Sequence, residues 1–164
     1  FASDLRHCLT WLEQQNASNT SPYFMRVDTA ALGLSGHSMG GGASVLAAAA
    51  DSRVRVVAPL AAAETNPSAI AAAATVAAPL FLISGSNDTI TPIAGNTQPM
   101  YATANPPRQL PVILGGFHCG FTDAGFLFCD SGSNCPSHQA QPLGAKLNGK
   151  MRISATKGSA MGCS

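Results

Sequence analysis

The pentapeptide Gly-His-Ser-Met-Gly at residues 36–40 constrains the fold of this chain more than any other stretch. It follows a short, largely apolar run at residues 29–35 and precedes residues 43–50, which are rich in alanine, the strongest helix former. The sequence therefore predicts a strand, a sharp turn and a helix in succession. We expect the turn to force Ser38 into a strained backbone conformation. Side chains two residues to either side of Ser38 would then collide with the strand or the helix, which accounts for both glycines.

The rest of the chain repeats this alternation of strand and helix. Apolar side chains recur at helical spacing in some segments and in β-branched or continuous runs in others. The expected helices are residues 1–15, part of 60–78, and 92–104, and the expected strands are 54–58, 79–84 and 109–114. The continuous apolar run at 79–84 is typical of a parallel sheet covered on both faces. We therefore predict an α/β fold with a mostly parallel sheet flanked by helices.

Composition excludes several classes of function. Charged residues make up 10% of the 164 residues and the net charge is +1, so the charge predicts neither a nucleic-acid partner nor binding to an anionic membrane. No apolar run is long enough to span a membrane. The length fits one domain, which we place at residues 1–136, followed by a weakly patterned tail at 137–164.

The five cysteines bear on the cellular compartment. Their number is odd, so at least one is free or pairs between chains, and no C-x-x-C motif predicts a metal or redox site. Cys129 and Cys135 flank a turn-rich loop that a disulfide could close. We therefore expect a secreted or extracellular protein.

Ser38, Asp88 and His118 each follow an expected strand. Because the carboxyl ends of parallel strands meet at one edge of a sheet, we expect the three side chains to lie together. A serine hydroxyl needs a base to act as a nucleophile, and histidine, with an unperturbed pKa of about 6.5, can take and return a proton near neutral pH. A carboxylate then holds the imidazole in the required tautomer. The chain order Ser, Asp, His is the order of nucleophile, acid and base on such a sheet.

The serine and the histidine also have plainer interpretations. Ser38 could simply cap the helix that follows it, and His118 could be a loop residue held by hydrogen bonds. We favour His118 as the base because it lies between glycines after a strand. The other histidines lie in the first helix, inside the Gly-His-Ser-Met-Gly motif and in the tail, namely His7, His37 and His138.

The acid has a rival in Glu64, which follows the strand at 54–58. Asp88 lies in a Gly-Ser-Asn-Asp sequence that is also an ordinary turn pattern. Asp123 and Asp130 come after His118, so either would break the chain order. We assign Asp88 as the acid and keep Glu64 as the alternative.

The motifs quoted above resemble those of the α/β-hydrolase superfamily. Residues 36–42, 84–92 (Ser-Gly-Ser-Asn-Asp-Thr-Ile-Thr-Pro) and 115–118 are most similar to cutinase-like polyester hydrolases and to chlorophyllase- and dienelactone-hydrolase-like esterases. The resemblance covers roughly residues 1–120. It implies ester hydrolysis through an acyl-enzyme, without a metal or cofactor. The roles that it implies are Ser38 as nucleophile, Asp88 as acid, His118 as base and the N–H of Met39 as one oxyanion donor.

The chain resembles the carboxyl-terminal part of such an enzyme. The strands that precede the serine motif in the superfamily, and the loop that supplies the second oxyanion donor, are not found in the sequence. Without them the strand before the motif would have an unpaired edge. We therefore expect the chain to be a fragment or to pair with a second chain that supplies the missing strands.

The sequence thus predicts a serine-dependent hydrolase of carboxylic esters. Met39, Phe117 and Phe121 near the site favour small-molecule or polymeric esters of acyl or polyester type, although these three could equally be ordinary core residues. Two other functions stay open. One is a non-catalytic or incomplete hydrolase fragment that retains the triad, and the other is an acyltransferase that passes the acyl group to an alcohol or thiol.

Overall fold

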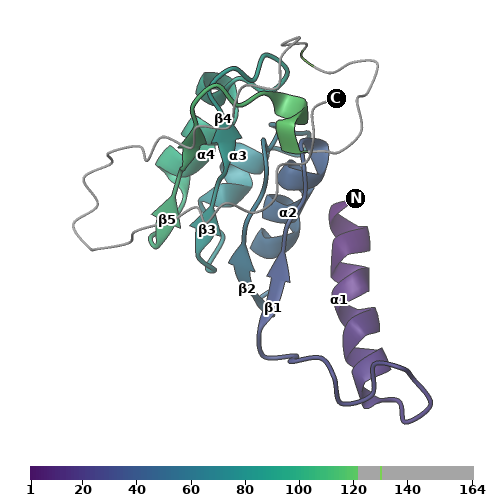
Figure 1. Cartoon of the computed structure of the whole chain (residues 1–164). Coiled ribbons are helices and arrows are strands. Elements are labelled where there is room, and N and C mark those ends of the chain that lie inside the picture. Colours follow the sequence, from purple (N-terminus) through teal and green to yellow (C-terminus); the bar gives the residue numbers. More distant parts are fainter. Residues whose placement is uncertain (122–129, 131–164) are drawn as a thin grey trace, which may run out of the picture.

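The computed structural model describes residues 1–121 and residue 130. Within them, a four-stranded parallel sheet has the strand order β1-β2-β3-β5, and a second parallel pair joins β4 to β6. The strands are β1 (Leu32–Leu34), β2 (Val54–Val57), β3 (Leu80–Phe81), β4 (Ser84–Gly85), β5 (Arg108–Gln109) and β6 (Val112–Ile113). The predicted α/β fold with a mostly parallel sheet is confirmed (Figure 1).

Two of the expected strands are each divided into two short segments. The strand expected at 79–84 forms β3 and β4, and the strand expected at 109–114 forms β5 and β6, with the register unchanged. The N–H of Ser84 donates to the carbonyl of Pro111 at 3.1 Å, so the two strands stay paired between the short segments. The ladder is interrupted because the nitrogen of Pro111 carries no hydrogen to donate in return.

The helices pack against one another in chain order, α1 on α2, α2 on α3 and α3 on α4 (Figure 1). They are α1 (Ala2–Ala17), α2 (Met39–Ala49), α3 (Ala69–Ala73) and α4 (Thr97–Thr103), with short 3-10 turns η1 (Ile93–Gly95) and η2 (His118–Phe121). The helix expected at 92–104 is thus divided, because Asn96 between η1 and α4 has a non-helical backbone, with φ −129° and ψ −88°. None of the helices in the described part is long and apolar enough to cross a membrane.

The core lies between the sheet and these helices. Leu80 and Leu82 are buried against apolar side chains of α2, α3 and α4, whereas Phe81 and Ile83, which alternate with them, are only half-buried. In the described residues the run is thus buried on one face and half-buried on the other. Side chains of a strand point alternately to opposite faces, and the described helices bury one face more completely than the other.

Arg53 ties α1 to the turn between α2 and β2. Its guanidinium donates to Asp51 at 2.9 and 2.6 Å, and to Glu13 and Thr10 of α1. The side chain of Asp51 is 4% exposed, and the hydrogen bond from Arg53 lowers the pKa of its carboxyl to about 2. This ion pair stabilises the packing of α1 on the rest of the fold.

The structure describes two of the five cysteines, Cys8 and Cys119. Cys8, on α1, is free and exposed, whereas Cys119 is disulfide-bonded. The disulfide expected between Cys129 and Cys135 and the tail expected at 137–164 lie outside the described residues.

Candidate active site

Ser38 lies between β1 and α2, in the sharp turn predicted from the sequence. Its φ of 57° and ψ of −119° lie outside the regions that residues other than glycine normally adopt, so the expected backbone strain is present. The N–H of Ser38 donates to Leu60 at 2.9 Å, and its carbonyl accepts from Ala63 at 3.0 Å. These bonds hold the strained residue from the segment that follows β2. The Ser38 side chain does not cap α2, so its hydroxyl is left for other chemistry.

The two glycines of the motif differ in their surroundings. A Cβ on Gly36 would lie 2.4 Å from the carbonyl oxygen of Gly40, whereas a Cβ on Gly40 would meet no heavy atom within 4 Å. The predicted collision is therefore present at Gly36 and absent at Gly40. The position of Gly40, in the first turn of α2, faces open space.

Asp88 and His118 form a buried pair. Asp88 follows β4, and His118 follows β6 and begins η2. Nδ1 of His118 lies 2.9 Å from Oδ2 of Asp88, and the two side chains are 5% and 0% exposed. Because an ionised carboxylate can only accept, Nδ1 carries the hydrogen of this bond. The other ring nitrogen, Nε2, is then the one that can accept a proton.

Asp88 is held in its charged form. Its Oδ1 accepts hydrogen bonds from the N–H of Ile90 at 3.0 Å and of Thr91 at 2.7 Å. Burial raises the pKa of the Asp88 carboxyl, but the hydrogen bonds from His118 and Thr91 outweigh burial, and the pKa lies below its ordinary value. The carboxylate is therefore negative at neutral pH and can stabilise an imidazolium.

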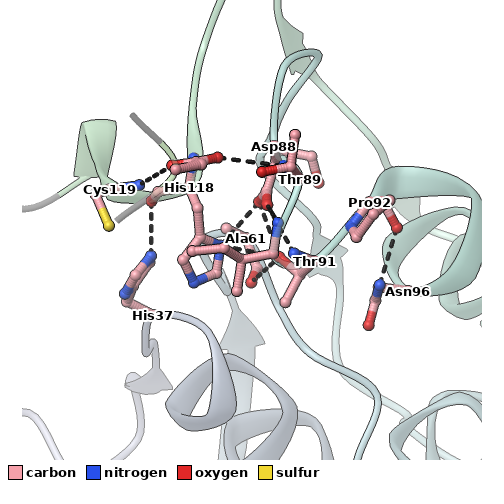
Figure 2. A network of polar contacts seen from close by, with 12 residues as sticks. His37, Ala61, Asp88, Thr89, Thr91, Pro92, Asn96, His118 and Cys119 are labelled. Atoms are coloured by element: carbon pink, nitrogen blue, oxygen red, sulfur yellow. Dashed lines mark hydrogen bonds and ion pairs between the residues drawn. The ribbon is translucent and has the colours of Figure 1, made fainter. Parts of the chain in front are cut away.

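Thr91 belongs to the same network, which sequence reasoning missed. Its Oγ1 lies 2.8 Å from Oδ2 of Asp88 and 3.0 Å from both Nδ1 of His118 and the carbonyl of Ala61 (Figure 2). Because Nδ1 carries a hydrogen, the hydroxyl oxygen can only accept from the histidine ring, sharing that hydrogen with Asp88, while its own hydrogen donates to Asp88 or to Ala61. The spacing Asp-x-x-Thr, in which the threonine lies one turn after the acid, is the pattern that could have indicated this contact.

His37 connects the turn at Ser38 to the histidine loop. Its Nε2 donates to the carbonyl of His118 at 2.9 Å, and the two imidazole rings are 4.5 Å apart at their centroids (Figure 2). Because His37 precedes Ser38 in the chain, this contact brings the loop of His118 to the turn that carries the serine. Within the described residues the Ser38 hydroxyl forms no hydrogen bond with His118. Such bonds are often long before substrate binds.

Glu64, the rival acid, is engaged elsewhere. Its Oε2 accepts a hydrogen bond from the N–H of Ile70 at 2.8 Å, at the start of α3. Its own N–H donates to the side chain of Asn96 at 2.8 Å. Of the two acids considered for the triad, Asp88 is therefore the one whose carboxylate bonds to His118.

The family of the chain follows from a comparison with known families. A model of the PETase family, described as PET hydrolase-like, matches residues 2–126. The chain belongs to the PETase family. This confirms the predicted relationship to cutinase-like polyester hydrolases and makes the chain an ester hydrolase of the α/β-hydrolase type. No curated protein matches the chain.

Three apolar residues of this member of the PETase family lie beside the site, because Met39 follows Ser38, Phe117 precedes His118 and Phe121 contacts His37. Met39 is 56% exposed, and Phe117 and Phe121 are half-buried, so none of the three belongs to the buried core. The ring of Phe121 lies 6.1 Å from that of His37, measured between centroids. The alternative that these three are ordinary core residues is therefore wrong.

The N–H of Met39 is available to a ligand. Met39 begins α2, and its N–H donates to no acceptor in the described part of the chain. It lies at the amino end of α2, where the helix dipole favours negative charge. Among residues 1–121 and 130, no group of three His, Cys, Asp or Glu side chains is arranged to hold a metal ion.

Proposed function

We propose that this PETase-family chain hydrolyses carboxylic esters of acyl or polyester type through Ser38, His118 and Asp88. The observation that carries the proposal is the buried 2.9 Å hydrogen bond between Asp88 and His118, next to a strained turn that presents a serine. A buried, charged carboxylate on Nδ1 of a histidine is the arrangement that prepares Nε2 to act as a base.

In the first half of the reaction, Oγ of Ser38 attacks the ester carbonyl carbon while Nε2 of His118 takes the hydroxyl proton. The carbonyl π electrons move to the oxygen and form a tetrahedral oxyanion. The N–H of Met39 donates to this oxyanion, and Asp88 stabilises the imidazolium. When the tetrahedral species collapses, the C–O bond to the alcohol breaks and the alcohol leaves with the proton from Nε2. The acyl group stays on Ser38.

In the second half, water replaces the alcohol. Nε2 of His118 takes a proton from water as the water oxygen attacks the acyl carbon. The second tetrahedral species collapses by breaking the bond to Oγ of Ser38, which recovers its proton from Nε2. The products are the carboxylic acid and the free serine, so no redox partner or metal is needed to balance the reaction.

The side chains around the site support an apolar acyl group. Met39, Phe117 and Phe121 add apolar surface beside the serine and the histidine. An aromatic or aliphatic ester would bury this surface and gain about 25 cal/mol per Å² of apolar area removed from water. Membership of a PET hydrolase-like family supports polyesters among the substrates.

The first test is turnover of a short-chain p-nitrophenyl ester by the wild type and Ser38→Ala. We expect wild-type release of p-nitrophenol and at least a thousandfold lower kcat in the variant. Removal of a whole triad lowers kcat by about 10⁶-fold. Labelling of Ser38 by a fluorophosphonate reports the activated nucleophile independently. Wild-type turnover equal to that of Ser38→Ala would refute the proposal.

Two further experiments distinguish the substrate classes and separate hydrolysis from acyl transfer. Release of soluble acid from a polyester film tests the polymeric substrate, with Ser38→Ala as the control. Addition of an alcohol acceptor distinguishes hydrolysis from acyl transfer, because a transferase forms the new ester in preference to the acid. No turnover together with no labelling would make the chain a non-catalytic member of its family.

A further inference from the structure

Asp130 connects the loop that carries the acid to the loop that carries the base. Its Oδ2 accepts hydrogen bonds from the N–H of His118 at 2.8 Å and of Thr89 at 3.2 Å, and its Oδ1 accepts one from the N–H of Cys119 at 3.3 Å. Thr89 directly follows Asp88 in the chain. One carboxylate group therefore holds backbone amides from both sides of the buried pair.

These contacts close a ring of hydrogen bonds. On one side, the side chains of Asp88 and His118 are joined at 2.9 Å. On the other side, the backbone of Thr89 and the backbone of His118 meet at a single oxygen of Asp130. The two loops are thus fixed at two separate points, and neither can shift without breaking a bond.

The backbone of His118 is held at both of its polar groups. Its N–H donates to Asp130, and its carbonyl accepts from Nε2 of His37 at 2.9 Å. The freedom that remains to His118 is rotation of its side chain, and Asp88 limits that rotation through Nδ1. The direction of Nε2 therefore depends on Asp130 as well as on Asp88.

An aspartate suits this place because both of its oxygens accept hydrogen bonds and neither donates. Within the described residues Asp130 forms no ion pair, so its charge is balanced by the three N–H groups. Bonds from N–H groups to a charged carboxylate are about twice as strong as bonds between neutral groups.

We propose that Asp130 is a positioning residue for the reaction. It fixes the loop after β4 to the loop after β6 and so keeps His118 on Asp88 with a fixed direction of Nε2. This inference rests on the proposed function and adds to it a residue that touches neither the substrate nor the reacting atoms.

Two substitutions of Asp130 and one control test the inference. Asp130→Ala removes all three acceptors. Asp130→Asn keeps one oxygen, which can still accept from His118 and Thr89, but it turns an NH₂ group toward the N–H of Cys119. Asp28→Ala is the matched control, because Asp28 also accepts a backbone N–H, at 2.9 Å, in an exposed turn at the opposite end of β1 from Ser38.

We expect Asp130→Ala to lower kcat for the p-nitrophenyl ester by about a hundredfold, the cost of displacing a catalytic group by about 1 Å. KM should stay unchanged, because the residue does not touch the substrate. The kcat of Asp130→Asn should lie between that of Asp130→Ala and that of the wild type. The kcat of Asp28→Ala should equal that of the wild type. If Asp130→Ala does not fold, Asp130→Asn decides the question by the same measurement.

Amide hydrogen exchange at Thr89, His118 and Cys119 gives a second readout that does not need turnover. Exchange at these amides should become faster in Asp130→Ala and stay unchanged in Asp28→Ala. A wild type without Ser38-dependent turnover would refute the proposed function, while the exchange rates would still test the position of Asp130. Wild-type kcat in Asp130→Ala, or unchanged exchange at His118, would overturn the inference.

Discussion

Substitution of Gly36 by alanine should destabilise the fold, whereas the same substitution at Gly40 should not. The added Cβ at Gly36 would lie 2.4 Å from the carbonyl oxygen of Gly40 and 2.5 Å from its carbon, where ordinary contacts begin at 3.4 Å. Because backbone atoms cannot rotate away as the end of a flexible side chain can, the first turn of α2 must move by about 1 Å to restore an ordinary contact. At Gly40 nothing lies within 4 Å of the added atom.

The size of the effect follows from these contacts. Overpacking costs about 1–3 kcal/mol in free energy of unfolding. With a urea m value of about 2 kcal/mol/M, a loss of about 2 kcal/mol lowers the unfolding midpoint of Gly36→Ala by about 1 M. Gly40→Ala meets no collision and replaces a poor helix former by the best one, so its midpoint should stay or rise, by at most about 1 kcal/mol in free energy.

Equilibrium urea unfolding followed by circular dichroism measures both midpoints. The two variants change the same residue type in the same pentapeptide, so each is the control of the other. Equal midpoints for Gly36→Ala and the wild type would refute the steric argument. An equal fall of the unfolding midpoint in both variants would also refute the steric argument. Such a result would show that loss of glycine, and not the collision, determines stability.

Other residues give further predictions. Asp88→Asn should lower kcat by about 10⁴-fold, because an amide favours the wrong tautomer of the base, while Glu64→Gln should leave kcat unchanged in the same p-nitrophenyl ester assay. Thr91→Val removes a hydrogen bond to a charged group and should lower kcat by about tenfold; an unchanged kcat would show that the hydroxyl is dispensable. The pKa of the Asp51 carboxyl is lowered from 3.8 to about 2 by Arg53, so its contribution to stability is complete above pH 3.8 and is lost as the pH falls through about 2. Calorimetry should therefore show a smaller fall in Tm over this range for Asp51→Asn than for the wild type, and equal falls would contradict the pairing.

Local patterns were enough to predict the parallel sheet and its helices. A parallel strand such as residues 54–58 is rich in β-branched residues, and a helix such as α2 is rich in helix formers, so both are recognisable from neighbouring residues alone. The division of the strand at 109–114 was not predicted. Its cause is Pro111, and the effect of a missing N–H depends on which residue of another strand lies opposite, which no local pattern contains.

The three predicted triad residues follow from the same logic, because Ser38, Asp88 and His118 come after parallel strands. Their catalytic roles remain predictions, although the contact between Asp88 and His118 is present. Chain order led us to set Asp130 aside as an acid. That order restricts the nucleophile, the base and the carboxylate that binds the base. A carboxylate that only accepts backbone N–H bonds can come from anywhere in the chain.

The strained backbone of Ser38 has a consequence for the order in which heat acts on the molecule. A residue in such a conformation carries about 1–3 kcal/mol that is released as soon as the surrounding bonds open. Its ties run to Leu60 and Ala63, outside the turn itself. Local detachment of residues 60–63, which include the buried Ala62, would therefore let the serine relax into an ordinary conformation. On the proposed function, we therefore expect thermal inactivation to begin at a lower temperature than global unfolding.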